Sequence, residues 1–230
     1  MGNSLDKKFF IANILIFIGA MACLIYYDWH GGLWLKGVTS LWFVIHGLVN
    51  LVYAKKIGLH SCKVLYVIEF GLFLGMLADV LLGINFIVGV AAFALGHVFY
   101  IIAFNIIEKP RLKDFAFVLP IAAIAIFVVT GTPFITVDDP FMEKVLIAYA
   151  VIISWMLGKA LSNYSINKST FAKIIAVGSV LFLFSDLILA VDMFGTSSRM
   201  TWILCSYTYW PAQNLLAQSM YNYAKENRAV

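Results

Sequence analysis

Charged residues are scarce in this sequence. Only 12% of its 230 residues are Asp, Glu, Lys or Arg, whereas 63% are hydrophobic. A soluble domain averages about half apolar and about a quarter charged residues. The scarcity of charge excludes soluble nucleotide-binding folds and nucleic-acid-binding modules, so we expect no nucleic-acid partner. The composition predicts a membrane protein.

Cysteine pairs and cofactor motifs are also lacking. The sequence has three cysteines, an odd number, and they show no CxxC or Cys/His ligand spacing. This indicates free thiols. No Walker, GxSxG or HExxH pattern is present, which argues against a P-loop enzyme, a serine hydrolase or a zincin. His46 and His97 are expected at comparable depth, but no ligand spacing supports a heme or zinc site there. We expect neither a metal nor an organic cofactor.

Long apolar stretches fill most of the chain. A membrane-spanning helix needs about 20 mainly apolar residues, and eight such stretches are bounded by charge, Gly or Pro. The first follows Lys7 and Lys8 and imitates a signal peptide, but its removal would leave an odd number of spans. We expect an all-α integral membrane protein, a single eight-helix domain over residues 1–230. The predicted helices cover residues 9–27, 33–54, 64–83, 86–107, 114–131, 143–163, 171–192 and 200–222.

Basic residues are distributed unevenly between the two sides of this predicted bundle. One side receives 13 of the 16: Lys7, Lys8, Lys55, Lys56, Lys63, Lys109, Arg111, Lys113, Lys159, Lys168, Lys173, Lys225 and Arg228. The other receives Lys36, Lys144 and Arg199. Because cytoplasmic loops carry the excess of Lys and Arg, both termini are expected to be cytoplasmic. The short loops favour a bacterial inner membrane.

One internal repeat is visible. Residues 71–83, GLFLGMLADVLLG, resemble residues 178–190, GSVLFLFSDLILA, and each copy has Gly, seven residues and then Asp. The copies lie four predicted helices apart and therefore run in the same direction across the membrane. This arrangement indicates a possible parallel duplication of four plus four helices.

Three carboxylates fall inside the predicted spans: Glu69, Asp79 and Asp186. A charge at the centre of a bilayer costs about 2.5–3.5 kcal/mol even on insertion scales, so such residues are functional candidates. Asp79 and Asp186 are expected at equal depth, facing one another without a buried Lys or Arg. The alternative is that they only hydrogen-bond neighbouring helices. Glu69 lies deeper, and its role stays open between structure and function.

Other polar residues share helix faces near these acids. His97 and Tyr100 are three residues apart, and Tyr209 and Gln213 are four apart, so each pair lies on one face of its helix. Lys36, near the predicted outer surface, either binds a phosphate or extends its amine to the interface. Taken alone, His97 fits a helix-packing role as well as a functional one.

At these positions the sequence resembles YhhN-like membrane proteins. Residues 71–104 resemble the signature of an Asp closing one helix, followed by Gly-x-x-x-Phe-x-x-x-His-x-x-Tyr in the next. The later helices match through a Gly-Phe-Ser-Asp pattern and a Tyr-x-x-x-Gln pattern. Two positions depart from the family pattern: Ala78 replaces a frequent Gly, and Lys36-Gly37 replaces an expected Lys-Pro. The matching residues are Gly89, Phe93, His97, Tyr100, Gly178, Phe182, Ser185, Asp186, Tyr209 and Gln213.

The family includes lysoplasmalogenases, so the resemblance implies hydrolysis of the vinyl ether of a 1-alkenyl lysophospholipid within a membrane of other lipids. This reaction needs an acid, a negative charge and a water, and two aspartates can divide those roles as paired carboxylates do in glycosidases. Asp79 and Asp186 are the expected catalytic pair. The apolar neighbours of Asp79 weakly favour it as the proton donor. The expected substrate-binding residues are Lys36, Glu69, His97, Tyr100, Ser185, Tyr209 and Gln213.

Two other functions are compatible with the sequence. In a proton-coupled transporter of small molecules or lipids, the same carboxylates would be proton or cation sites, and the repeat would mediate alternating access. In a non-catalytic membrane scaffold, the buried acids would only join helices.

Overall fold

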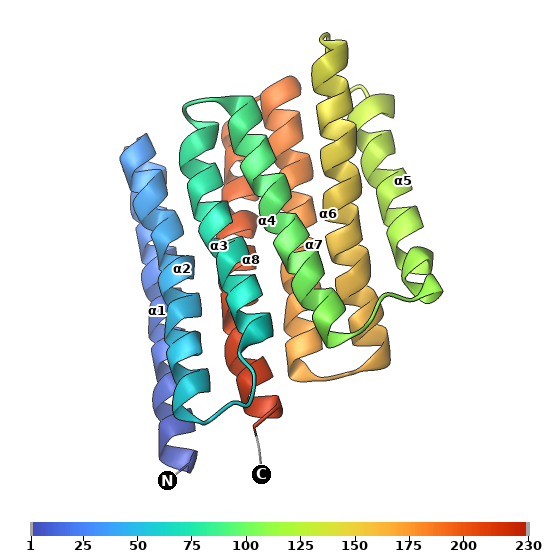
Figure 1. Ribbon diagram of the computed structural model, residues 1–230. Coiled ribbons are helices and arrows are strands. Elements are labelled where there is room, and N and C mark those ends of the chain that lie inside the picture. The colour runs from blue at the N-terminus through green and yellow to red at the C-terminus, as the bar shows by residue number, and fades with distance from the viewer. Residues whose placement is uncertain (1, 229–230) are drawn as a thin grey trace.

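The computed structural model describes residues 2–228, and over these residues it contains helices and no strand (Figure 1). A single 3-10 turn, η1 (Leu112–Asp114), precedes α5. The eight long helices are α1 (Gly2–His30), α2 (Leu33–Lys56), α3 (Lys63–Leu82), α4 (Phe86–Ile107), α5 (Phe115–Gly131), α6 (Pro140–Ile166), α7 (Thr170–Phe194) and α8 (Arg199–Glu226).

Seven candidate spans, formed by α1 to α4, by η1 together with α5, and by α6 and α7, are long and apolar enough to cross a membrane, as an integral multi-pass membrane protein requires. The eighth long helix, α8, has 28 residues, about 42 Å at 1.5 Å per residue. It is more polar, and its polar side chains, among them Gln213 and Asn214, are buried against neighbouring helices. An eighth span therefore stays a prediction, because composition alone does not identify it.

Local sequence explains where the helices begin. Side-chain oxygens cap the free backbone N–H groups of four helices: Asn85 accepts from Val88, and Asp139, Ser169 and Ser198 do the same for α6, α7 and α8. Between α1 and α2 the chain reverses through Gly31 and Gly32, whose φ angles of 65° and 94° favour residues without a Cβ.

The helices are connected alternately at the two ends of the bundle (Figure 1). The first and last described residues lie at one end. The connections α1–α2, α3–α4, α5–α6 and α7–α8 lie at the other, which we name the distal end. Within the bundle, α8 packs against α2, α3 and α7, and α6 packs against α4, α5 and α7. An interior space is thus surrounded by five helices: α3, α4, α6, α7 and α8. Across this space α4 and α7 do not pack directly against each other in the described part of the chain.

The predicted helix boundaries are close to the observed ones within the middle of the chain. Residues 86–107 are the observed α4, and the prediction for α3 differs by one residue at each end. The first and last helices are longer than predicted. Apolar stretches end at charged residues such as Lys8 and Asp28, whereas the hydrogen-bonded helix continues beyond them.

The two repeat glycines are both packed closely by the following helix. A Cβ at Gly71 would meet the Tyr100 ring of α4 at 2.6 Å, and one at Gly178 would lie 3.3 Å from the Ala212 carbonyl oxygen of α8. The duplication itself stays a prediction.

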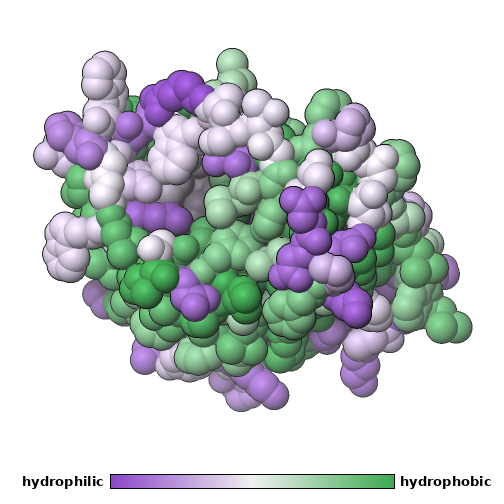
Figure 2. Space-filling view, turned by 90° about the horizontal axis from the view of Figure 1, so that it is seen from above, coloured by the Kyte–Doolittle hydropathy of each residue, from purple (hydrophilic) through white to green (hydrophobic). Residues whose placement is uncertain are grey.

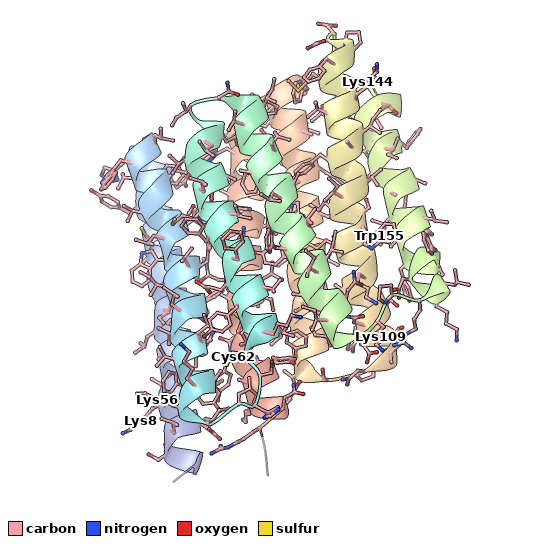
Figure 3. All side chains as sticks on the ribbon, viewed as in Figure 1. Lys8, Lys56, Cys62, Lys109, Lys144 and Trp155 are labelled. Atoms are coloured by element: carbon pink, nitrogen blue, oxygen red, sulfur yellow. The ribbon has the colours of Figure 1, made fainter. Side chains whose placement is uncertain are left out.

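The distribution of basic residues requires one correction. Lys8, Lys56 and Lys109 lie at the end that carries the termini, and Lys144 lies at the distal end (Figure 3). Lys159, which the charge count assigns to a membrane surface, is instead completely buried, with its Nζ 2.9 Å from Asp114 Oδ2. The pairing explains the difference, because attraction to a buried carboxylate offsets part of the cost of removing the ammonium group from water. The cytoplasmic location of the termini stays a prediction.

Candidate active site

Asp79 is the centre of one polar cluster. It lies in the last turn of α3 and is only 2% exposed. Its Oδ2 accepts hydrogen bonds from Ser40 of α2, at 2.6 Å, and from the Tyr209 hydroxyl of α8, at 2.7 Å. Its Oδ1 lies 3.6 Å from Lys36 Nζ. Two hydroxyl donors and an ammonium group thus face this carboxylate.

The position of Lys36 corrects one expectation. The sequence predicts acids without a cationic partner, whereas Lys36 turns inward and pairs with Asp79. Lys36 and Ser40 are four residues apart, so they lie on the same face of α2 and reach the same carboxylate. The side chain of Lys36 keeps 17% of its surface exposed, which leaves room for a further contact.

Tyr209 is held in turn by two of the predicted site residues. Gln213 Nε2 donates to the Tyr209 hydroxyl at 3.3 Å, and the Tyr100 hydroxyl donates to Gln213 Oε1 at 2.7 Å. Both partners are buried. Gln213 contacts Tyr209 and Tyr100 contacts Gln213, and neither residue lines the cavity beside Asp79.

Asp186, on α7, is the centre of a second cluster. Its Oδ2 accepts a hydrogen bond of 2.5 Å from the Tyr149 hydroxyl of α6, and Ser185 Oγ lies 3.3 Å from its Oδ1. His97 Nε2 of α4 lies 2.8 Å from the Tyr149 oxygen and 3.6 Å from Asp186 Oδ2. Since Tyr149 gives its one proton to Asp186, His97 must donate to Tyr149 through an Nε2–H group. His97 Nδ1 has no hydrogen-bond partner among the described residues.

Both aspartates line the same cavity. This cavity has a volume of about 200 Å³, and Lys36, Tyr209 and Trp202 also line it. Seen from the distal end, the molecule is hollowed, and hydrophilic residues border part of the hollow (Figure 2). The cavity is large enough for several water molecules or for part of a polar ligand. We name it the polar cavity.

Glu69 lies apart from this arrangement. It precedes Asp79 by ten residues, about 15 Å along α3, and does not line the polar cavity. It is 9% exposed and packs beside Gly47 of α2, and neither carboxyl oxygen has a hydrogen-bond partner within residues 2–228. The polar clusters of Asp79 and Asp186 thus contain all predicted site residues except Glu69, but of the expected substrate-binding residues only Lys36 and Tyr209 line the polar cavity.

Two residues of the site are missing from the sequence prediction. Tyr149 joins His97 to Asp186, and Ser40 bonds to Asp79 and also accepts from Trp210 Nε1 at 3.3 Å. A single Tyr or Ser in an apolar helix has no distinctive spacing. Only the four-residue separation of Ser40 from Lys36 offered a signal.

No group of three or more His, Cys, Asp or Glu side chains within the described part of the chain is arranged to hold a metal ion. The three cysteines are free thiols. Cys205 is the one that lines the polar cavity.

Comparison with known proteins identifies a family. Neither the curated proteins nor the solved structures provide a match. The model of the YhhN family matches residues 40–220, a segment that contains Ser40, Asp79, His97, Tyr149 and Asp186. Since the match covers well over half of the chain and both aspartate clusters apart from Lys36, this protein belongs to the YhhN family.

Proposed function

We propose that this protein is a membrane hydrolase that cleaves the vinyl ether bond of 1-alkenyl lysophospholipids. The observation that supports this most directly is that two carboxyl groups with different partners, Asp79 and Asp186, line one cavity. The substrate class comes from the family, which includes lysoplasmalogenases. The products are a fatty aldehyde and a glycerophospho-base.

The chemistry needs two carboxyl groups in different protonation states. A vinyl ether, R–CH=CH–O–R′, hydrolyses when a proton is added to the carbon that does not bear oxygen. The resulting oxocarbenium ion is captured by water, and the hemiacetal then separates into R–CH₂–CHO and R′–OH. A protonated acid starts the reaction, and an ionised carboxylate stabilises the cation and takes a proton from the water, as in paired-carboxylate glycosidases.

The contacts favour Asp186 as the proton donor. Asp186 has no Lys or Arg within ion-pair distance in the described chain, and it borders apolar side chains such as Leu187 and Met193. The sequence weakly favours Asp79 as the proton donor, because its sequence neighbours are apolar. The structure favours the reverse assignment, because Lys36 and Tyr209, from two other helices, contact Asp79.

Asp79 is then the ionised partner. Its two hydroxyl donors and Lys36 compensate a negative charge, so it can stabilise the oxocarbenium ion and accept a proton from the attacking water. When the hemiacetal collapses, Asp79 returns that proton to the departing glycerol oxygen. Asp186 takes the proton of the hemiacetal hydroxyl, so both carboxyl groups regain their starting states.

Tyr149 and His97 have a positioning role in this scheme. After Asp186 gives up its proton, the hydrogen bond from Tyr149 stabilises the carboxylate, and the Nε2–H group of His97 polarises Tyr149. Both residues also fix the orientation of Asp186 toward the cavity.

The test is to incubate the detergent-purified protein with alkenyl, alkyl and acyl lysophospholipids and to measure aldehyde and fatty acid by mass spectrometry. Protonation of C=C has no counterpart in an alkyl ether or an ester. We therefore expect cleavage of the alkenyl lipid with at least about a hundredfold preference, or about 2.8 kcal/mol in transition-state free energy. Comparable release of fatty acid would identify a lysophospholipase instead. Lipid movement driven by a proton gradient, without product, would identify a transporter.

A further inference from the structure

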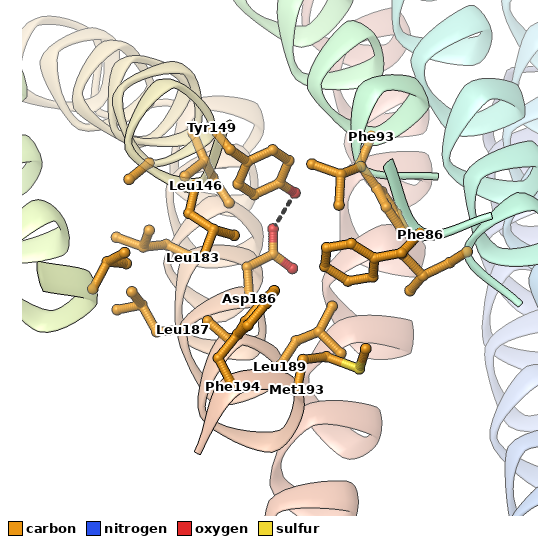
Figure 4. A pocket seen from close by; sticks show the side chains of 16 residues that line it. Phe86, Phe93, Leu146, Tyr149, Leu183, Asp186, Leu187, Leu189, Met193 and Phe194 are labelled. Carbon is orange, nitrogen blue, oxygen red and sulfur yellow. Dashed lines mark hydrogen bonds between the residues drawn. The ribbon is translucent and has the colours of Figure 1, made fainter. Parts of the chain in front are cut away.

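A second, apolar cavity adjoins the polar cavity. Its volume is about 50 Å³, and we name it the apolar cavity (Figure 4). Asp186 lines both cavities, as do Leu82, Phe93, Leu189 and Met193. Asp186 therefore lies at the junction between a space bordered by Lys36 and Asp79 and a space bordered by hydrocarbon.

The apolar cavity lies where two helices separate. Near the end that carries the termini, α4 and α6 are joined by a hydrogen bond of 2.9 Å from Asn163 Nδ2 to the Phe104 carbonyl. Midway along, His97 and Tyr149 join them at 2.8 Å. Toward the distal end the two helices diverge, and α7 lies behind the gap (Figure 1). Side chains of α4, α6 and α7 line the apolar cavity at this level.

The walls of the apolar cavity suit hydrocarbon rather than water. Tyr149 and Asp186 supply its polar groups, and these point toward one another and are hydrogen-bonded together (Figure 4). The remaining lining is Leu, Phe, Val, Ile, Ala and Met. A water molecule needs two to four polar partners, so a cavity of this kind stays dry or takes an apolar ligand.

We propose that the apolar cavity holds the part of a lysolipid's single hydrocarbon chain that lies nearest the head. The rest of the chain extends toward the bilayer between the distal halves of α4 and α6. The polar head then lies in the polar cavity, and the bond between head and chain lies beside Asp186. This inference adds a chain-binding site to the proposed hydrolase. Chain binding itself does not depend on the reaction.

Labelling with a lipid that resists the proposed hydrolysis tests the site. The probe is a 1-O-alkyl lysophosphocholine with a diazirine close to the head end of its chain, added to the detergent-purified full chain. Photolysis should attach it to residues of the apolar cavity, such as Val90, Leu146 or Met193. Unlabelled alkyl lysophosphocholine should compete. Labelling confined to outward-facing residues of the bundle overturns the proposal.

A matched pair of substitutions on α6 separates chain binding from general disturbance. Ala150 lines the apolar cavity and is 4% exposed, whereas its neighbour Val151 is 39% exposed and does not line it. Ala150→Phe should reduce labelling of the cavity at least tenfold, and Val151→Phe should leave it unchanged. If Ala150→Phe does not fold, Leu146→Trp narrows the same space. Equal labelling in a folded cavity variant and in Val151→Phe also overturns the proposal.

The outcomes keep the two proposals distinct. Labelling of the apolar cavity without cleavage of any alkenyl lipid supports the chain site and rejects the hydrolase. Cleavage that is equally fast in Ala150→Phe, with labelling elsewhere, supports the hydrolase and rejects the chain site. If both proposals hold, Ala150→Phe should slow cleavage of the alkenyl lipid, and Val151→Phe should not.

Discussion

Two acid–lysine pairs, each with a buried carboxylate, occupy opposite ends of this bundle, and they differ in what surrounds them. Asp114 and Lys159, near the end with the termini, are 2.9 Å apart, and Ser162 and the Arg111 backbone N–H complete the bonding of the carboxylate. Asp79 and Lys36, toward the distal end, are 3.6 Å apart and line a cavity of about 200 Å³. Asp114 has close partners on all sides, whereas Asp79 has a side open to a ligand.

The difference shows how a carboxylate that stabilises the fold can be distinguished from one that takes part in a reaction: the second has a cavity beside it. Burial of the carboxylate by itself does not decide between the two roles, since Asp79 and Asp114 are both buried and both bear a cost of desolvation. Asp114 and Lys159 line neither the polar nor the apolar cavity. The role of Asp79 is therefore inferred from the space beside it and from Asp186 across that space, and each inference has a measurable consequence.

The largest effect is expected from the two cavity aspartates. Asp79→Asn and Asp186→Asn preserve size but remove a charge or a transferable proton, and acid–base groups typically contribute about 10²- to 10⁴-fold to rate. Each variant should lose at least about a hundredfold in kcat on alkenyl lysolipid, measured as aldehyde release. The double variant should be little slower than the slower single one, because the two residues act as a unit.

Size-exclusion chromatography and thermal unfolding in detergent provide the control that both variants are folded. Near-normal turnover by either one would contradict the proposed pair. A site built around His97 and Glu69 would then be the better hypothesis.

Substitution in the Asp114–Lys159 pair should lower stability rather than activity. Asp114→Asn leaves the buried ammonium of Lys159 without a counter-charge, and breaking a buried ion pair typically costs about 3–5 kcal/mol. We expect a large loss of stability against unfolding, while turnover per folded molecule stays close to normal. Adding Lys159→Met should restore part of the stability, since it removes the unpaired charge.

The partly exposed pair Arg111–Glu108 offers a matched control. Glu108→Gln should lower the free energy of unfolding by less than about 1 kcal/mol, because exposed ion pairs contribute little. A catalytic defect in folded Asp114→Asn, as large as that of Asp79→Asn, would remove the distinction between the two pairs.

Much of the helical arrangement could be predicted from this sequence. Apolar length and bounding polar residues placed α3 and α4 within one residue at each end, because a bilayer fixes how long an apolar stretch must be. The cost of a charge in hydrocarbon also marked Asp79 and Asp186. These are properties of single segments and need no knowledge of which helices touch.

What escaped prediction depends on contacts between helices. Lys36 belongs to α2, yet its partner is on α3, and Tyr149 of α6 bridges α4 and α7. The sequence predicts a surface position for Lys159, because a positive charge in a sequence carries no mark of its buried counter-ion. One sequence gives the face of a helix, but the rotation of one helix against another is set by packing.

The smallest effect is expected at the residues that act through Asp186. His97→Ala removes the donor to Tyr149, and Tyr149→Phe removes the donor to Asp186, while the carboxyl group itself remains. Each should reduce kcat about tenfold, close to 1.4 kcal/mol, with KM for alkenyl lysolipid little changed. If His97 acts only through Tyr149, His97→Ala should have little further effect in a Tyr149→Phe background. Independent, multiplicative losses would show that His97 acts on the substrate or on Asp186 directly.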